Sequence, residues 1–325
     1  MAKPAARIVA NGQDITKLLI GSAEQSILVS LRINDEAGLK SDTMELTVDN
    51  REPFDIPPIG SLVEVWLGYE PSPVPMGKFR LDHWELSGPP SILTLTAASA
   101  ELTTEIKGQK TRSWHDTTLG QIASKIAGEH SLGLSIAPDL ASREVEHIDQ
   151  QTESDLNFLS RLAKRNGAVF KLADGKILLA EKGSDLHPSG TQKLETKITP
   201  SDVVSWRIEE SERGQNGSVK CQWVDHEAGK RKTVTAGSGS PVQRDKRLYR
   251  TEAEAGAAAR ALLGDLQRGK RSGSIEMAGN PALYAGCILG LSGFHAAVDG
   301  QQSVSSVTHE LRSSGYTTSA SFESV

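Results

Sequence analysis

The segment from Gln150 to Glu181 carries the densest set of folding signals in the sequence. Thr152 followed by Asp155 predicts the start of a helix, as in a capping box with a shortened acid. We expect one buried helix face, with Phe158 at its margin, made of Leu156, Leu159, Leu162 and Ala163. We therefore expect the apolar face of this helix to pack against another element of the fold.

A stop signal and a hairpin follow this helix. Asn166-Gly167 predicts a left-handed helix end. Two short strands, 168–172 and 176–180, flank the turn Ala173-Asp174-Gly175. The segment contains no candidate pair of catalytic residues, so we expect it to have a structural role.

Composition sets the class of protein. The 325 residues are enough for two or three domains, each with its own core. The net charge of −5 implies no global attraction to nucleic acid or to an anionic membrane. Thirty glycines and fourteen prolines indicate many turns, and hence a β-rich protein.

The compartment is predicted from what the sequence lacks. The first residues have no apolar core of a signal peptide, and no apolar run approaches the ~20 residues that span a bilayer. We therefore expect no membrane insertion, and synthesis and assembly in the cytoplasm. Cys221 and Cys287 allow one disulfide, but reduced thiols are favoured.

Residues 1–105 alternate apolar and polar side chains, as half-buried strands do. Asn11-Gly12 predicts a hairpin turn after a strand that begins at Arg7. Further strands are expected at 28–33, 43–49, 61–68, 78–86 and 92–98. This spacing indicates a first small β-barrel or sandwich domain.

Residues 106–195 change to a helical period and predict an α/β insert. Asp116 or Thr117 is expected to cap a helix, and a short strand follows at 134–136. The apolar stripe of this helix is Leu119, Ile122, Ala123, Ile126 and Ala127.

Residues 196–325 return to strands and predict a second β-barrel. We expect strands at 203–210, 218–224, 232–236, 274–277, 287–291, 303–310 and 316–322. Thr251 with Glu254 makes a capping box for a helical insertion near 251–269. Gly237 to Pro241 is predicted to be a mobile loop. The fold class is thus α+β, mainly β.

Groupings that suggest chemistry have simpler explanations. His115-Asp116 is read as a helix cap, because neighbouring side chains rarely face each other. Asp225-His226-Glu227 precedes a turn, and His147 with Asp149 lacks a third ligand. The glycine-lysine segment at 229–233 lacks the spacing of a phosphate loop. The sequence therefore predicts no catalytic, cofactor or metal site.

Basic residues bracket the third predicted helix. They are Arg244, Lys246, Arg247 and Arg250 on one side, and Arg268, Lys270 and Arg271 on the other. A solvated rim is the simpler interpretation, and a surface for an acidic partner is the functional one. A nucleic-acid surface is a third hypothesis, although aromatic residues, 5% of the chain, do not interleave with these charges.

The order of short motifs over nearly the whole chain resembles the late control protein D family of contractile-tailed phages, the tail hub. This family is related in fold to the N-terminal part of type VI secretion VgrG spike proteins. The motifs that carry the resemblance are residues 9–15, 41–46, 60–69, 77–79, 113–127, 153–163, 279–286, 300–309 and 315–318.

This resemblance implies two related β-barrels per chain and a homotrimeric pseudo-sixfold ring. Such a ring would adapt the sixfold tail tube to the threefold spike, with baseplate wedge components and the tape measure protein as further neighbours. It also implies a location in the tail of a phage or of a pyocin-like particle, with nucleic acid met only as it passes through the channel.

The insert also resembles a LysM-like fold, which keeps a peptidoglycan-binding or cell-wall-cleaving tail module as the alternative function. The chain ends at Val325, just after the last predicted strand, so we expect the spike to be a separate polypeptide.

Overall fold

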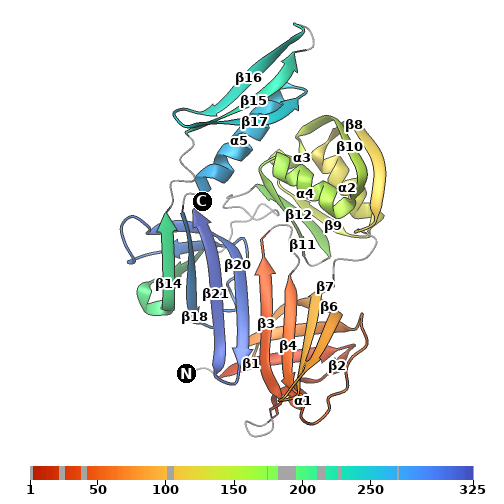
Figure 1. Ribbon diagram of the computed structural model, residues 1–325, viewed down its shortest axis with the longest axis vertical. Helices are drawn as coiled ribbons and strands as arrows, with labels where there is room; N and C mark the ends of the chain where they lie inside the picture. Colours follow the sequence, from red (N-terminus) through yellow and green to blue (C-terminus); the bar gives the residue numbers. More distant parts are fainter. Residues whose placement is uncertain are drawn as a thin grey trace.

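A computed structural model describes residues 3–21, 26–37, 42–100, 106–173, 175–181, 195–210, 217–225, 228–268 and 271–324. The fold is mainly β. Two curled sheet regions lie side by side at one end, and an α/β module and a helix-backed sheet lie at the other (Figure 1). Within the described ranges, no helix combines the length and apolar composition that a membrane span requires.

The N-terminal region forms one curled half of the long sheet. Its elements are β1 (Pro4–Ala10), β2 (Gln13–Asp14), α1 (Thr16–Ile20), β3 (Leu28–Glu36), β4 (Thr43–Asp49), β5 (Leu62–Tyr69), β6 (Val74–Ser87) and β7 (Ile92–Ser99). Asn11 and Gly12 have φ angles of 47° and 82°, as the predicted hairpin turn requires. The alternating side chains of these strands fill a common core.

The C-terminal region forms the other curled half. Its elements are β13 (Glu195–Ile198), the 3-10 turn η1 (Pro200–Asp202), β14 (Val203–Glu210), β18 (Arg271–Ala278), β19 (Ile288–Leu291), β20 (Gly300–Arg312) and β21 (Gly315–Ser324). Antiparallel pairing of β20 with β3 joins the halves into one sheet of 13 strands (Figure 1). Leu311 and Tyr316 accordingly pack into the N-terminal core.

The α/β module lies between these halves in sequence. It contains β8 (Gln109–Thr118), α2 (Leu119–Glu129), β9 (Gly133–Ile136), α3 (Pro138–Ala141), β10 (Glu144–Ser154), α4 (Asp155–Arg165), β11 (Ala168–Ala173) and β12 (Lys176–Glu181). The predicted hairpin is confirmed as β11 and β12, although Asp174 of its turn lies outside the described residues. Gly167 ends α4 with a φ of 66°, as predicted.

Both predicted caps in this module were displaced. Thr118, rather than Asp116 or Thr117, caps α2 in a capping box with Gln121. Ser154, rather than Thr152, caps α4, because β10 continues to Ser154 through an irregularity at which Thr152 has a φ of 46°. The predicted helix stripes are otherwise close to the observed buried faces.

Phe158 lies at the centre of the α4 core rather than at its margin. It is fully buried and stacks on Trp114 with ring centroids 6.1 Å apart. Leu156, expected on the buried face, is only partly buried. The five-residue stripe of α2 is buried as predicted.

A separate helix-backed sheet corrects the predicted second barrel. β15 (Ser218–Asp225), β16 (Lys230–Gly237) and β17 (Val242–Tyr249) form their own three-stranded sheet, and α5 (Glu252–Arg268) covers it. The predicted strands at 218–224 and 232–236 therefore do not join the long sheet. Ala255, Ala258 and Ala259 of α5 are buried against these strands, and their small side chains let the helix approach closely.

The predicted cap of α5 is confirmed. The Glu254 N–H donates to Thr251 Oγ1 at 3.2 Å, while the Glu254 carboxylate accepts from the Arg250 N–H. Cys221 and Cys287 are both buried and no disulfide joins them, and their reduced state stays a prediction.

Candidate functional site

The predicted basic surface lies mainly on one edge strand. Arg244, Lys246 and Arg247 lie on β17, Arg250 directly follows it, and all four are exposed. β17 is the last strand in the order β16-β15-β17. Charged side chains on such an edge also discourage pairing with other chains, so both predicted interpretations stay open.

The remaining basic residues are placed differently. Arg268 is the last residue of α5, and Lys270 lies outside the described residues. Arg271 begins β18 in the long sheet, where it pairs with Glu210 of β14 at 3.0 Å. Arg271 thus links two strands within the chain.

Arg247 instead lies within electrostatic range of Arg165 of α4, which the sequence did not associate with it. The side chain of Arg165 is exposed, but partial desolvation, reinforced by the charges of Arg161 and then Arg247, lowers its pKa. Arg161 is paired with Glu153 at 2.6 Å, but no ion pair joins Arg165 or Arg247 to another described residue. This arginine patch (Arg161, Arg165 and Arg247) concentrates positive charge where α4 approaches the β17 sheet.

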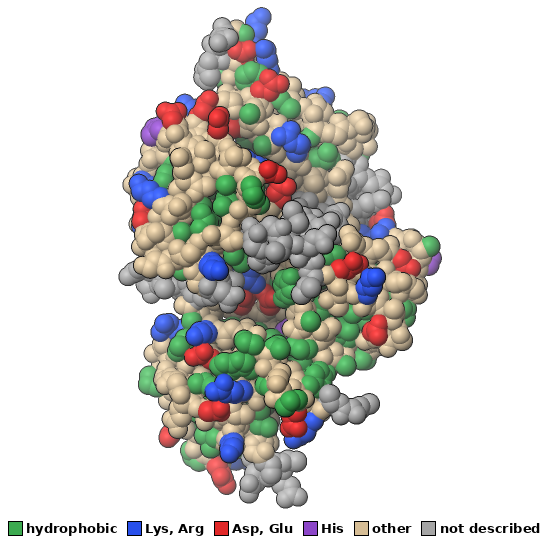
Figure 2. Space-filling model, turned by 180° about the vertical axis from the view of Figure 1, so that it is seen from behind, with side chains coloured by type: hydrophobic (Ala, Val, Ile, Leu, Met, Phe, Trp, Pro, Cys, Tyr) green, Lys and Arg blue, Asp and Glu red, His purple; other side chains and the backbone are tan. Residues whose placement is uncertain are grey.

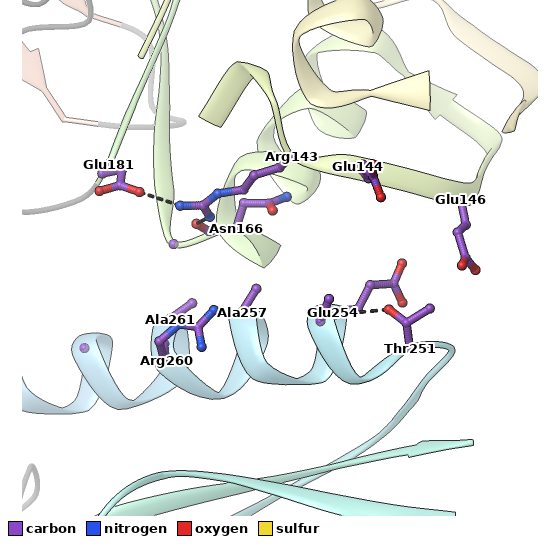
Figure 3. Close-up of a pocket in the computed structure, with 13 residues that line it drawn as sticks. Arg143, Glu144, Glu146, Asn166, Glu181, Thr251, Glu254, Ala257, Arg260 and Ala261 are labelled. Atoms are coloured by element: carbon purple, nitrogen blue, oxygen red, sulfur yellow. Dashed lines mark hydrogen bonds and ion pairs between the residues drawn. The ribbon is translucent and has the colours of Figure 1, made fainter. Parts of the chain in front are cut away.

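A cleft of about 800 Å³ separates α5 from the α/β module (Figure 3). On the module side, Arg143 donates to the Asn166 carbonyl at 2.5 Å and pairs with Glu181. Gly167 of the module lies opposite Ala261 of α5, and a Cβ added at Gly167 would lie 3.2 Å from the Ala261 Cβ, so the two walls nearly touch there. Among the described residues, the lining carries charges of both signs, namely Arg143 and Arg260 with Glu144, Glu146, Glu181 and Glu254.

One set of three potential metal ligands occurs among the described residues: Glu129, His130 and Asp155. Lys110 Nζ lies 2.6 Å from Asp155 and 2.9 Å from Glu129, in the position that a cation would take. Arg112 bonds both carboxylates as well. Two resident cations make this an ion network, and a metal does not fit.

Asp155 is the centre of that network. Burial favours a raised pKa, but hydrogen bonds from Lys110, Gln150 and His130, with the charge of Arg112, outweigh it and lower the pKa to about 2. Asp155 is therefore an ionised, fully buried anchor between β8, α2 and α4. The sequence interpretation of this residue as a helix cap missed its partners.

The structure also brings together two histidines that the sequence analysis treated separately. His115 of β8 lies directly opposite His147 of β10, and Asp149 contacts the second ring. His115 does not act with Asp116, which has a φ of 42° at the strand end. Only the pairing of β8 with β10 could have revealed this grouping.

Charge is dispersed over the rest of the surface. On the face seen in Figure 2, Lys and Arg are interspersed with Asp and Glu, and neither sign dominates. A broad nucleic-acid surface would show a basic stripe. The arginine patch is thus a local feature.

Comparisons with known proteins agree on one family. A family model described as phage tail baseplate hub (GPD) matches residues 85–315. The probable baseplate hub protein of Escherichia phage 186 is 31% identical, over 98% of this chain and 92% of that protein. The corresponding protein of Escherichia phage P2 is 31% identical, over 91% of this chain and 88% of that protein.

Solved structures share the fold at low identity. A tail protein from Neisseria meningitidis MC58 has a TM-score of 0.72 at 12% identity, covering 99% of this chain and 96% of that one. The 43 kDa tail protein of prophage MuSo2 from Shewanella oneidensis has a TM-score of 0.69 at 16% identity, covering 99% of this chain and 96% of that one. The c3393 protein of E. coli, a type VI secretion component, has a TM-score of 0.57 at 12% identity, covering 92% and 73%.

Proposed function

This chain belongs to the phage tail baseplate hub (GPD) family, and from that premise we propose that three copies close into a ring that adapts a sixfold tail tube to a threefold spike. The chain is a baseplate hub protein of contractile phage tails and is a component of the virion tail baseplate. Each copy contributes two curled sheet regions, so three copies supply six.

The observation that carries the ring is the open edge at β14. This strand ends the long sheet, and among the described residues it pairs with β18 alone. Val204 and Trp206 on it are 76% and 48% exposed. An unpaired edge with apolar side chains is a hazard for a lone subunit, and closure of a cyclic assembly covers it.

The partners follow from the ring. The tail tube would sit on one side and the spike on the other, with wedge components and the tape measure protein as further contacts and assembly in the host cytoplasm. We propose domains at 1–105, 106–195 and 196–325. The insert has a buried hydrophobic cluster of its own, separate from those of the two curled sheet regions, and this supports its boundaries. The β15–α5 unit has a further buried cluster.

Mass photometry of the full chain, alone and with its spike protein, tests the assembly. We expect three copies per particle in at least the sample with the spike. Val204→Glu should lower the trimer fraction at least tenfold, while Leu18→Glu, at another exposed apolar site on α1, should not. A monomer in both samples, or an unaffected Val204→Glu trimer, overturns the ring.

We propose a structural, non-enzymatic role, which the naming of the relatives as baseplate hub proteins supports. The turbidity of a cell-wall suspension checks this. Constant turbidity with the isolated chain is expected, and clearing would favour the wall-cleaving alternative.

A further inference from the structure

His115 and His147 form a cross-strand pair on the two-stranded sheet of β8 and β10. They occupy directly opposite positions, and their ring centroids are 4.5 Å apart. The two Nδ1 atoms face each other at 3.0 Å. His115 is exposed and His147 is partly buried, so solvent reaches the pair.

The carboxylate of Asp149 contacts the other ring nitrogen of His147 and orients that ring. His147 Nε2 lies 3.2 Å from Asp149 Oδ2, and the Ser113 hydroxyl donates to Asp149 Oδ1 at 2.6 Å. With Nε2–H donating to the carboxylate, His147 is left in the tautomer whose Nδ1 is an acceptor, and this atom faces His115 Nδ1.

We propose that His115 and His147 bind a divalent transition-metal ion, Cu²⁺ or Ni²⁺, through their two Nδ1 atoms, with Asp149 as a positioning residue. A metal-bound histidine that donates its other N–H to a carboxylate is the usual outer-shell arrangement. Solvent completes the coordination, and the ion joins β8 to β10.

The distance between the two Nδ1 atoms favours some metal ions over others. Two nitrogens 3.0 Å apart subtend roughly 90° at an ion bound ~2.1 Å from each. That is the angle between neighbouring ligands in square-planar or octahedral coordination, which Cu²⁺ and Ni²⁺ adopt. A tetrahedral Zn²⁺ needs a wider separation, so it binds more weakly here.

The surroundings of the pair also admit a cation. Among the described residues, no lysine or arginine side chain forms an ion pair with Asp149. At the Glu129, His130 and Asp155 network, by contrast, Lys110 already lies between the carboxylates. The histidine pair is thus an accessible donor set without a competing resident cation.

Isothermal titration calorimetry with CuCl₂, NiCl₂ and ZnCl₂, on the untagged full chain, tests the site. We expect one Cu²⁺ per chain, with Ni²⁺ weaker than Cu²⁺. His115→Ala and His147→Ala should each weaken Cu²⁺ binding at least tenfold. His83→Ala, which removes an exposed histidine on β6, should leave it unchanged.

Electron paramagnetic resonance of the Cu²⁺ complex separates ligands from mere structural support. Two coordinating nitrogens are expected in the parent protein and one in either histidine variant. Asp149→Asn should keep both nitrogens and weaken binding roughly 10–100-fold. Absence of saturable binding, or unchanged affinity in His115→Ala with its circular dichroism intact, overturns the site; unchanged affinity in Asp149→Asn overturns the role of Asp149.

Discussion

Lys171 of β11 forms an ion pair with Asp35 of β3, and this joins the α/β module to the long sheet. The other oxygen of Asp35 accepts a hydrogen bond from the Ala285 N–H at 2.8 Å. Lys171 also contacts Asp42 at 3.3 Å. One carboxylate therefore holds three segments that are remote in sequence, and the joint is largely shielded from solvent.

Lys171→Met should loosen the module from the long sheet. The substitution keeps the length of the side chain but leaves Asp35 and Asp42 without their shared cation, at a cost of about 1.5–3 kcal/mol. We expect differential scanning calorimetry to resolve an earlier transition for the module. Lys176→Met on the exposed part of β12 is the control, and identical scans for the two variants would contradict the joint.

Asp42→Asn should stabilise the protein in alkaline buffer. Burial raises the pKa of Asp42 to about 6, with Lys171 opposing the rise and Asp35 adding to it. The folded state thus holds this proton more tightly than the unfolded state, whose pKa is near 3.8. The resulting stability is complete below about pH 4 and is lost as the pH rises through about 6.

Asparagine cannot ionise, so the gain should be about 1–3 kcal/mol at pH 8 and small at pH 4. Urea denaturation at both values measures it. Asp82→Asn, at an exposed position on β6, should show no such difference. A gain for Asp42→Asn that is equal at the two pH values would refute the raised pKa.

Local patterns in the sequence predicted many of the elements but missed the strands β8, β10, β13 and β17. Alternation placed β4 at its observed bounds, and the helical stripe of α2 is buried throughout. The caps failed by one or two residues because Thr152 and Ser154 are both good capping residues. Only the irregularity in β10 decides between them.

Long-range pairing accounts for what the sequence could not predict. Alternation shows which face of β15 is buried but not which sheet receives it. Lys171 meets Asp35, and His115 meets His147, only because distant strands align. The resemblance to a family supplied the function, whereas these contacts required coordinates.

Leu159→Ala and Leu156→Ala should differ in cost, although the sequence placed both residues on the buried face. Leu159 is fully buried, so its truncation leaves a cavity and costs about 2–5 kcal/mol. Leu156 is only partly buried, and about 1 kcal/mol is expected. Equal shifts in the urea midpoint would show that the α4 core is packed differently.

Asp155→Asn should remove the anchor of the ion network. Lys110 and Arg112 lose their fully buried partner, and breaking such a pair costs about 3–5 kcal/mol. Because the pKa of Asp155 is lowered to about 2, its contribution is present above about pH 4 and disappears as the pH falls toward 2. Chemical denaturation from pH 7 to pH 2 should show the two proteins converging in acid, and Asp139→Asn on exposed α3 is the control.

Arg247→Glu should separate partner binding from folding. Arg247 is exposed and lies within the field of Arg165, so reversal of its charge relieves a repulsion, and the melting temperature should stay equal or rise. If the arginine patch meets an acidic surface of another baseplate protein, the same change weakens that contact. We expect at least a tenfold loss of infectious particles when a phage carrying this hub is complemented with the variant. Lys230→Glu, at an exposed position on β16, makes the same charge change away from Arg165, and the titre of infectious particles should stay unchanged. An unchanged titre for Arg247→Glu would mean that the charges of β17 protect a sheet edge and do not bind a partner.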